Sequence, residues 1–315
     1  MTKIAVLDDY QGAALDSADW SAVQARAEVH VFQDHVDHPD ALVARLLPFD
    51  AVCVMRERTP LPGSILERLP RLRFIGSNAP QNASIDLDAA KARGITVCST
   101  GGAANGAPEM TWALIHAAAR HVPAETASVR SGGWQMGVGA DLSGSTLGIM
   151  GLGKIGRKIA QVGRAFDMDV IAWSENLTEE AAAAAGARRV DKATLLRDAD
   201  WLTLHLALSP RTSGIVGAAE LAAMKPSAWL VNMSRGPLVD EAALVDALTR
   251  RVLAGGALDV FDIEPLPPRH PFRTLDNVVA SPHLGFVTAR IYAIFFGETV
   301  ENLLAWMDGT PIRVM

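Results

Sequence analysis

The stretch TLGIMGLGKIG, residues 146–156, joins an apolar segment to a glycine-rich turn. Its first five residues suit a buried strand, and a helix is expected to begin at Lys154. Gly151, Gly153 and Gly156 have the G-x-G-x-x-G spacing, and the motif requires a strand before it and a helix after it. The stretch therefore predicts a parallel α/β domain with a dinucleotide site.

Each glycine has a separate expected role in such a loop. Gly151 allows the tight turn, Gly153 lets a pyrophosphate approach the backbone, and Gly156 lets the helix pack closely on the strand. The N-terminus of the helix supplies backbone N–H groups and a partial positive charge, both of which favour phosphate. The alternative, an ordinary glycine turn, is less favoured because strand and helix are both in place.

The residues after the next strand, 169–173, bear on which dinucleotide binds. An acid is expected there to hold the adenosine ribose, but Ser174 occupies the position and Glu175 follows it. No lysine or arginine occurs from Trp173 to Glu180 to meet the extra phosphate of NADP. The sequence therefore favours NAD and leaves NADP open.

Outward from this loop, apolar strands alternate with helical stretches along the whole chain, the pattern of parallel sheets covered on both faces. The strands expected in the first third are residues 3–9, 51–55, 73–77 and 95–99. Those expected later are 146–150, 169–173, 201–206, 228–233, 255–261 and 277–283. At 315 residues, the chain is expected to form two α/β domains.

Composition limits the possible partners and location. A net charge of −6 argues against nucleic acid or an anionic membrane as partner, and no apolar run is long enough to span a membrane. The N-terminus runs directly into a strand, so no signal peptide is expected. Cys53 and Cys98 lie in apolar contexts and are expected in the core, which suits a reducing compartment. The expected location is the cytoplasm.

Three ionisable residues stand at or just beyond strand ends, where ligands bind in such sheets. They are Arg235 in NMSRGP, Glu264 in LDVFDIEP and His283 in ASPHLG. Taken singly, each has an ordinary interpretation: a surface arginine, a solvated loop acid and a hydrogen-bonded histidine. Their common position at one edge of a sheet makes them candidates for a site.

Five segments together resemble the D-isomer-specific 2-hydroxyacid dehydrogenases over nearly the whole chain: KIAVLDDYQGAAL, GLGKIG, NMSRGPLVDEAAL, GALDVFDIEPLP and NVVASPHLG. The resemblance implies that Arg235, Glu264 and His283 are a catalytic triad. Besides the three glycines, the cofactor contacts that it implies are Lys154, Ile155, Ser174, His205, Met233, Asp259 and Gly285. His205 has a second interpretation, as a core residue.

The resemblance also implies a domain plan of two doubly wound parallel-sheet domains. A Rossmann cofactor domain, 100–287, is inserted in a discontinuous flavodoxin-like substrate domain, 1–99 and 288–315, whose last helix has a broad apolar face. A homodimer is expected on the cofactor domain, through the apolar helix near Thr111–His121 and the glycine-rich arm at 132–144. No additional regulatory domain is expected after the last helix.

The chemistry of the triad agrees with this family. Hydride transfer to a 2-oxo acid must be accompanied by a proton, which histidine can supply near neutral pH. Glu264 would orient the ring of His283, and Arg235 would hold the substrate carboxylate with a planar fork. We expect an NAD-linked oxidoreductase that interconverts a small D-2-hydroxy acid and its 2-oxo acid. The alternative is a dinucleotide-sensing, corepressor-like binding protein on the same fold.

The expected substrate contacts are less well defined. Asn78 and Ala79 stand where the family usually has glycine, and Arg56 follows a strand of the first domain. Glyoxylate, hydroxypyruvate and pyruvate-like acids are the leading substrates. No metal site is expected, because the histidines of a polar, surface loop do not have zinc-ligand spacing; they are His30, His35 and His38. Trp112 and Trp134 are expected to serve packing and not to contact substrate.

Overall fold

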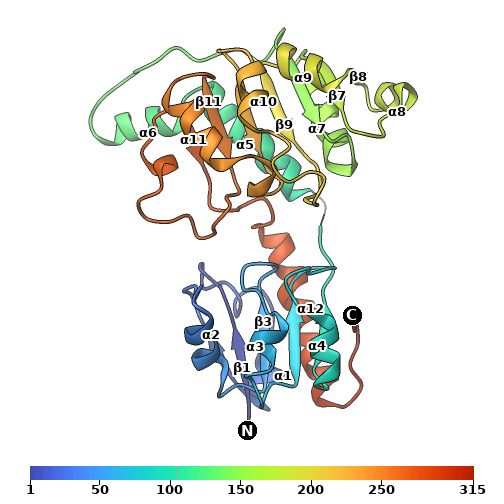
Figure 1. The fold of residues 1–315 in the computed structure, drawn as a ribbon. Coiled ribbons are helices and arrows are strands. Elements are labelled where there is room, and N and C mark those ends of the chain that lie inside the picture. The colour runs from blue at the N-terminus through green and yellow to red at the C-terminus, as the bar shows by residue number, and fades with distance from the viewer. Residues whose placement is uncertain (104) are drawn as a thin grey trace. The chain divides into compact units, whose positions relative to one another are not determined.

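A computed structural model describes residues 1–103 and 105–315. The chain divides into two compact units. The terminal unit comprises Met1–Ala103 and Val287–Met315, and the inserted unit comprises Ala104–Phe286. Figure 1 shows both ends of the chain in the terminal unit.

The terminal unit is built on a five-stranded parallel sheet with the order β2-β1-β3-β4-β5. Its strands are β1 (Thr2–Val6), β2 (Ala27–Val31), β3 (Ala51–Val54), β4 (Phe74–Ser77) and β5 (Thr96–Ser99). Its helices are α1 (Ser21–Gln24), α2 (Pro39–Leu46), α3 (Gly63–Leu66), α4 (Leu87–Ala92) and α12 (Ala289–Met307). The chain leaves β1 on one side for β2 and on the other for β3, which makes β1/β3 the switch point.

The last helix completes the core of the terminal unit. All four residues of β3 and of β4 are buried, as a parallel sheet covered on both faces requires. In α12, Phe295 and Phe296 are fully buried, and the helix contacts β4 and β5. After α12, the backbone N–H of Met315 donates to the carbonyl of Val97 at the end of the same sheet. The broad apolar face of α12 therefore packs inside this unit.

The inserted unit is built on a seven-stranded parallel sheet with the order β12-β11-β10-β9-β6-β7-β8. Its strands are β6 (Thr146–Met150), β7 (Asp169–Trp173), β8 (Arg188–Arg189), β9 (Trp201–Leu204), β10 (Trp229–Asn232), β11 (Gly255–Leu258) and β12 (Val278–Ala280). The strand order reverses between β6 and β9, so this switch point lies directly beside the glycine loop.

Helices connect the strands of the inserted unit. They are α5 (Gly106–Ala119), α6 (Val122–Arg130), α7 (Lys154–Ala165), α8 (Glu179–Ala184), α9 (Lys192–Asp198), α10 (Ala218–Ala223) and α11 (Glu241–Thr249), with short 3-10 turns η1 (Gly236–Leu238) and η2 (Pro271–Arg273). Thr178, Asp191 and Asp240 cap three of them, each accepting a hydrogen bond from the backbone N–H three residues later. Within the described residues, no helix is both long and apolar enough to cross a bilayer.

The expected fold class is confirmed: both sheets are parallel and belong to α/β units. The expectation for the histidine-rich segment is wrong in two places. His30 lies in β2, and the ring of His35 contacts the carboxylate of buried Asp8 at 2.8 Å. His38 caps α2. β2 was missed because its edge position leaves most of its residues half-exposed, without an apolar run.

The two cysteines lie in the core of the terminal unit. Cys53 on β3 and Cys98 on β5 are unpaired thiols, 1% and 0% exposed. Burial raises the pKa of Cys53 to about 12 and that of Cys98 to about 11. Their expected place in the core is confirmed.

Candidate active site

The glycine loop between β6 and α7 has two glycines that the chain itself requires. Gly151 has φ of +106°, a conformation that other residues rarely adopt. A Cβ at Gly156 would lie 2.3 Å from the carbonyl oxygen of Gly151. A Cβ at Gly153 would meet nothing within 4 Å, and this residue is exposed. The backbone at Gly153 is therefore open to a ligand, which fits the approach of a pyrophosphate.

His205 follows β9 on the other side of the same switch point. A Cβ at Gly151 would meet the His205 carbonyl oxygen at 2.7 Å, so the two segments are in close contact. The residue as a whole is partly exposed, but its Nε2 is buried and has no hydrogen-bond partner among the described residues. Burial lowers the pKa of His205 to about 4, so its ring is neutral at pH 7. A buried polar atom without a partner, beside an open glycine loop, fits a site that a cofactor completes.

The other expected cofactor contacts lie along the carboxyl edge of the same sheet. Ser174 directly follows β7 and is half-buried, whereas Glu175 is exposed. Lys154 is exposed and Ile155 half-buried in the first turn of α7. At the far end, a Cβ at Gly285 would lie 3.3 Å from Cε of Met233.

His283 and Glu264 form a hydrogen-bonded pair. The Nδ1 of His283 lies 2.5 Å from Oε2 of Glu264, and Oε1 of Glu264 accepts a hydrogen bond from the backbone N–H of Phe261 at 3.0 Å. Their side chains are 21% and 26% exposed. Because Nδ1 is engaged by the carboxylate, Nε2 of His283 is the ring nitrogen left to exchange a proton with a ligand.

The turn that carries Arg235 follows β10, the strand between β9 and β11. The side chain of Asn232 makes two hydrogen bonds to this turn. Its Nδ2 donates to the carbonyl of Arg235 at 2.9 Å, and its Oδ1 accepts from the N–H of Ser234 at 3.1 Å. A Cβ at Gly236 would lie 2.2 Å from the backbone carbon of Phe261. The turn of Arg235 therefore lies directly against the segment that leads to Glu264.

Asp259 at the end of β11 holds the turn of His283. Its carboxylate is 1% exposed and accepts hydrogen bonds from the Ser281 hydroxyl at 2.5 Å and from the N–H groups of Leu284 and Gly285 at 2.7 and 2.8 Å. Burial raises the pKa of Asp259, and these hydrogen bonds oppose the rise. His283 has φ of +54°, so its turn needs such support. A cofactor contact by Asp259 stays a prediction.

Asn78 and Ala79 follow β4 in the terminal unit and are 2% and 3% exposed. Oδ1 of Asn78 accepts from the Thr299 hydroxyl at 2.7 Å, and the N–H of Ala79 donates to the carbonyl of Ser77. Arg56 follows β3 with φ of +55° and is half-buried. A substrate contact by Asn78 or Ala79 stays a prediction and would have to add to these internal bonds.

The sequence reasoning missed the residues that hold the site together. Asn232 could have been suspected, because it is a polar residue at the end of a buried strand. Ser281, Glu241 and His270 gave no local signal, because their partners lie about 20 to 30 residues away in sequence.

Comparison with known proteins agrees with this arrangement. Residues 112–285 match the family model described as D-isomer specific 2-hydroxyacid dehydrogenase, NAD binding domain. A glyoxylate reductase of Aeropyrum pernix is 40% identical over 78% of this chain and 76% of the relative. A D-3-phosphoglycerate dehydrogenase of Methanocaldococcus jannaschii is 36% identical over 80% of this chain, which spans about half the length of that relative (51%).

A solved structure shows the same fold along the chain. A phosphoglycerate oxidoreductase from Vibrio cholerae O395 is 38% identical, with a TM-score of 0.92 over 98% of this chain and 100% of the other. The likeness therefore covers both units.

Proposed function

Because the chain belongs to the D-isomer-specific 2-hydroxyacid dehydrogenase family, we propose that it reduces a small 2-oxo acid with NADH through Arg235, Glu264 and His283. Members of this family are NAD-dependent oxidoreductases that act on the CH–OH group of their donors. The observation that carries the proposal is the 2.5 Å contact of His283 with Glu264, one strand away from the turn of Arg235.

NADH supplies the hydride when it is bound. The protein must then deliver a proton to the 2-oxo oxygen, and Nε2 of His283 is the atom that we assign to this step. The carboxylate of Glu264 on Nδ1 stabilises the protonated ring and fixes its orientation. In the oxidative direction, the same nitrogen accepts the hydroxyl proton.

Arg235 binds the substrate carboxylate in this proposal. Arg235 is half-buried as a residue, and its Nη1 donates to the carbonyl of Ser234 at 2.8 Å, which limits its conformations. A planar guanidinium can hold a carboxylate through two parallel hydrogen bonds and can polarise a 2-oxo oxygen. The fixed cation thus orients the acid relative to His283.

We assign cofactor binding to the glycine loop, to His205 and to the other expected contacts along the carboxyl edge of the sheet, all of which lie in the inserted unit. Recognition of the rest of the substrate is assigned to the terminal unit, with Arg56, Asn78 and Ala79 as candidates. Glyoxylate is the first substrate to test, because relatives from Aeropyrum pernix and Thermococcus litoralis are named glyoxylate reductases. Hydroxypyruvate and pyruvate follow.

The proposal is tested by measuring reduction of glyoxylate, hydroxypyruvate and pyruvate with NADH and with NADPH, in the wild type and in His283→Ala. We expect turnover of at least one acid, a preference for NADH, and a loss of turnover in the variant. If no short 2-oxo acid is reduced with either cofactor, the proposed substrate class is wrong. The relatives from Aeropyrum pernix, Methanocaldococcus jannaschii and Vibrio cholerae are enzymes by name, which favours a dehydrogenase over a binding protein.

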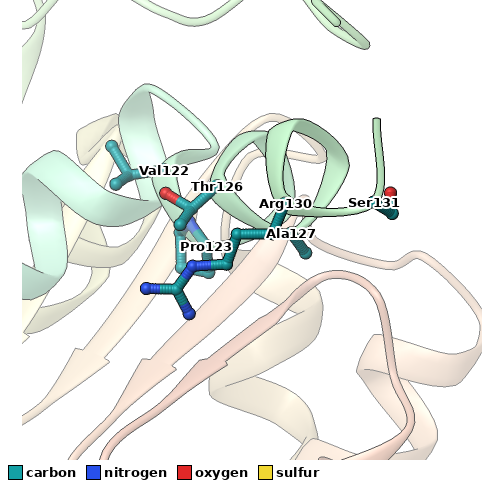
Figure 2. Close-up of a pocket in the computed structure, with 6 residues that line it drawn as sticks. All are labelled: Val122, Pro123, Thr126, Ala127, Arg130 and Ser131. Carbon is teal, nitrogen blue, oxygen red and sulfur yellow. The ribbon is translucent and has the colours of Figure 1, made fainter. Parts of the chain in front are cut away.

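We also propose a homodimer. The apolar helix expected in its interface, near Thr111–His121, is largely α5, and most of its apolar residues are buried in their own unit. We therefore assign the interface to α6 and to the arm that follows it, residues 132–144. Five apolar side chains there are about half exposed or more: Val122 (48%), Val129 (55%), Trp134 (73%), Met136 (70%) and Val138 (95%). Trp112 is buried, in agreement with its expected packing role, whereas the packing expected of Trp134 is not found within a single chain. The adjoining hollow has a volume of about 590 Å³. Figure 2 labels the residues that line it, which are Val122, Pro123, Thr126, Ala127, Arg130 and Ser131. A second copy would cover this apolar surface.

The proposed location is the cytoplasm. Cys53 and Cys98 are unpaired thiols, which suit a reducing compartment. Cell fractionation tests this assignment, and recovery of the protein outside the cytoplasm would contradict it.

A further inference from the structure

A second carboxylate–histidine pair lies close to the loop that carries Glu264. Glu241 is the first residue of α11, and its Oε1 lies 3.1 Å from Nε2 of His270. The two side chains are 23% and 14% exposed, so the pair is more buried than an ordinary surface ion pair. The triad does not use either residue.

The hydrogen bonds of His270 show which way its protons point. The N–H of Phe272 donates to Nδ1 of His270 at 3.2 Å, so Nδ1 is an acceptor. Nε2 therefore carries the proton and donates a hydrogen bond to Oε1 of Glu241. The ring of His270 also packs on Phe272, with ring centroids 4.6 Å apart.

Glu241 joins this histidine to the catalytic loop. Its other oxygen, Oε2, accepts a hydrogen bond from the backbone N–H of Asp262 at 3.2 Å, two residues before Glu264. The same short segment is held from a second direction, because Phe261 lies directly against Gly236 of the Arg235 turn. One carboxylate thus connects α11, which follows the Arg235 turn, to the backbone that presents Glu264.

The charges nearby do not explain why an acid occurs at position 241. Burial raises the pKa of Asp262, and the charges of Glu241 and Asp240 raise it further, while His270 opposes the rise. Glu241 is a third carboxylate beside Asp240 and Asp262, so its negative charge adds repulsion. Its hydrogen bonds, one to a backbone N–H and one to a histidine N–H, are the favourable part of the arrangement.

We propose that Glu241 and His270 are positioning residues that hold Phe261–Glu264 in the conformation in which Glu264 meets His283. The inference rests on the proposed function, because it assigns Glu241 and His270 a role through Glu264. Neither residue is expected to touch substrate or cofactor.

The test is the pH dependence of 2-oxo acid reduction in Glu241→Gln. A glutamine can still accept from Asp262, but its amide N–H₂ then faces the N–H of His270, so one of the two bonds is lost. With Glu264 less well placed, the carboxylate stabilises the protonated ring of His283 less. We expect a roughly tenfold lower kcat, below the hundredfold that a 1 Å misplacement can cost. The alkaline fall of the rate should move to lower pH, while NADH binding is unchanged.

His270→Asn is the second variant. Asparagine can still cap η2 by accepting from Phe272, but it is too short to reach Glu241. It should move the alkaline fall in the same direction as Glu241→Gln, and the double variant should behave like the single ones, because all three break the same connection.

Glu220→Gln is the matched control. In α10, Glu220 also accepts one backbone N–H, that of Gly217 at 3.0 Å, and pairs with one side chain, that of Lys192 at 2.9 Å. It should cost comparable stability and leave the pH profile unchanged. If Glu241→Gln and His270→Asn lower only thermal stability, like this control, the positioning role is wrong.

Glu264→Gln separates this inference from the proposed function. A shifted profile in Glu264→Gln with an unshifted one in Glu241→Gln overturns only the positioning role. An unshifted profile in Glu264→Gln itself overturns the role that the proposed function gives to Glu264, whatever the other variants do.

Discussion

At the scale of single residues, the two nitrogens of His283 are divided between two tasks: Nδ1 contacts Glu264, and Nε2 is available for a substrate. Replacing His283 by alanine should lower kcat by roughly 10²–10⁴-fold, the usual effect of losing an acid–base group. Quenching of protein fluorescence by NADH should show unchanged cofactor affinity. A variant that turns over at the wild-type rate would assign the proton to another group.

His205 gives a prediction about stability. Its pKa in the folded protein is about 4, below the 6.5 of an ordinary histidine. Between these values the unfolded chain binds a proton that the folded chain excludes, so the protein without cofactor loses stability as the pH falls from 6.5 towards 4. His205→Gln should weaken this acid sensitivity, because glutamine does not bind a proton in this pH range. Each kcal/mol of unfolding free energy that the variant retains at low pH raises Tm by about 2–4 °C.

The measurement is the Tm of thermal unfolding between pH 7 and 4.5, for the wild type, His205→Gln and His30→Gln. His30 is half-exposed and serves as the control. Parallel curves for all three proteins would mean that His205 does not contribute.

At the scale of elements, the loop between β6 and α7 separates glycines needed for folding from one needed for binding. Gly153→Ala places a methyl group in open space, so the free energy of unfolding should stay within about 0.5 kcal/mol of the wild type, while NADH affinity falls by about tenfold or more. Gly156→Ala would press a methyl group against the backbone at Gly151 and should lower Tm before any cofactor is added. Equal NADH affinity in Gly153→Ala and wild type would contradict the proposed pyrophosphate position.

The elements that could be predicted from the sequence are those with local signals. β6 and β7 each contain an apolar run, followed by Gly151 in the first case and by Ser174 in the second, and their bounds are those expected. Edge strand β2 and the exposed helix α6 lack such a run. The hydrogen bond from the N–H of Gly285 to the carboxylate of Asp259 joins residues that are 26 apart in sequence. No pattern along the chain indicates a contact of that kind.

At the scale of the whole molecule, the exposed apolar surface of α6 and its arm predicts assembly. The double variant Trp134→Ser, Met136→Ser replaces two side chains that are each at least 70% exposed in the single chain. Sedimentation velocity at micromolar concentration should show a dimer for the wild type and a monomer for this variant. Leu47→Ser, at a site 43% exposed in the terminal unit, should remain dimeric. A monomeric wild type would contradict the proposed homodimer.

The terminal unit is made of two separate segments of the chain, so it cannot be completed during translation until the second segment has been synthesised. Residues 1–103 are translated before the inserted unit, but they lack two later contacts of their own unit. The ring of Trp306 in α12 lies 5.1 Å from that of Phe74, and Val314 forms an isolated bridge with Cys98. Domains usually mature in the order of synthesis, N-terminal first. Here the inserted unit should mature first. Nascent chains arrested once Phe286 has left the ribosome should yield a protease-resistant 104–286 fragment, while residues 1–103 are still digested.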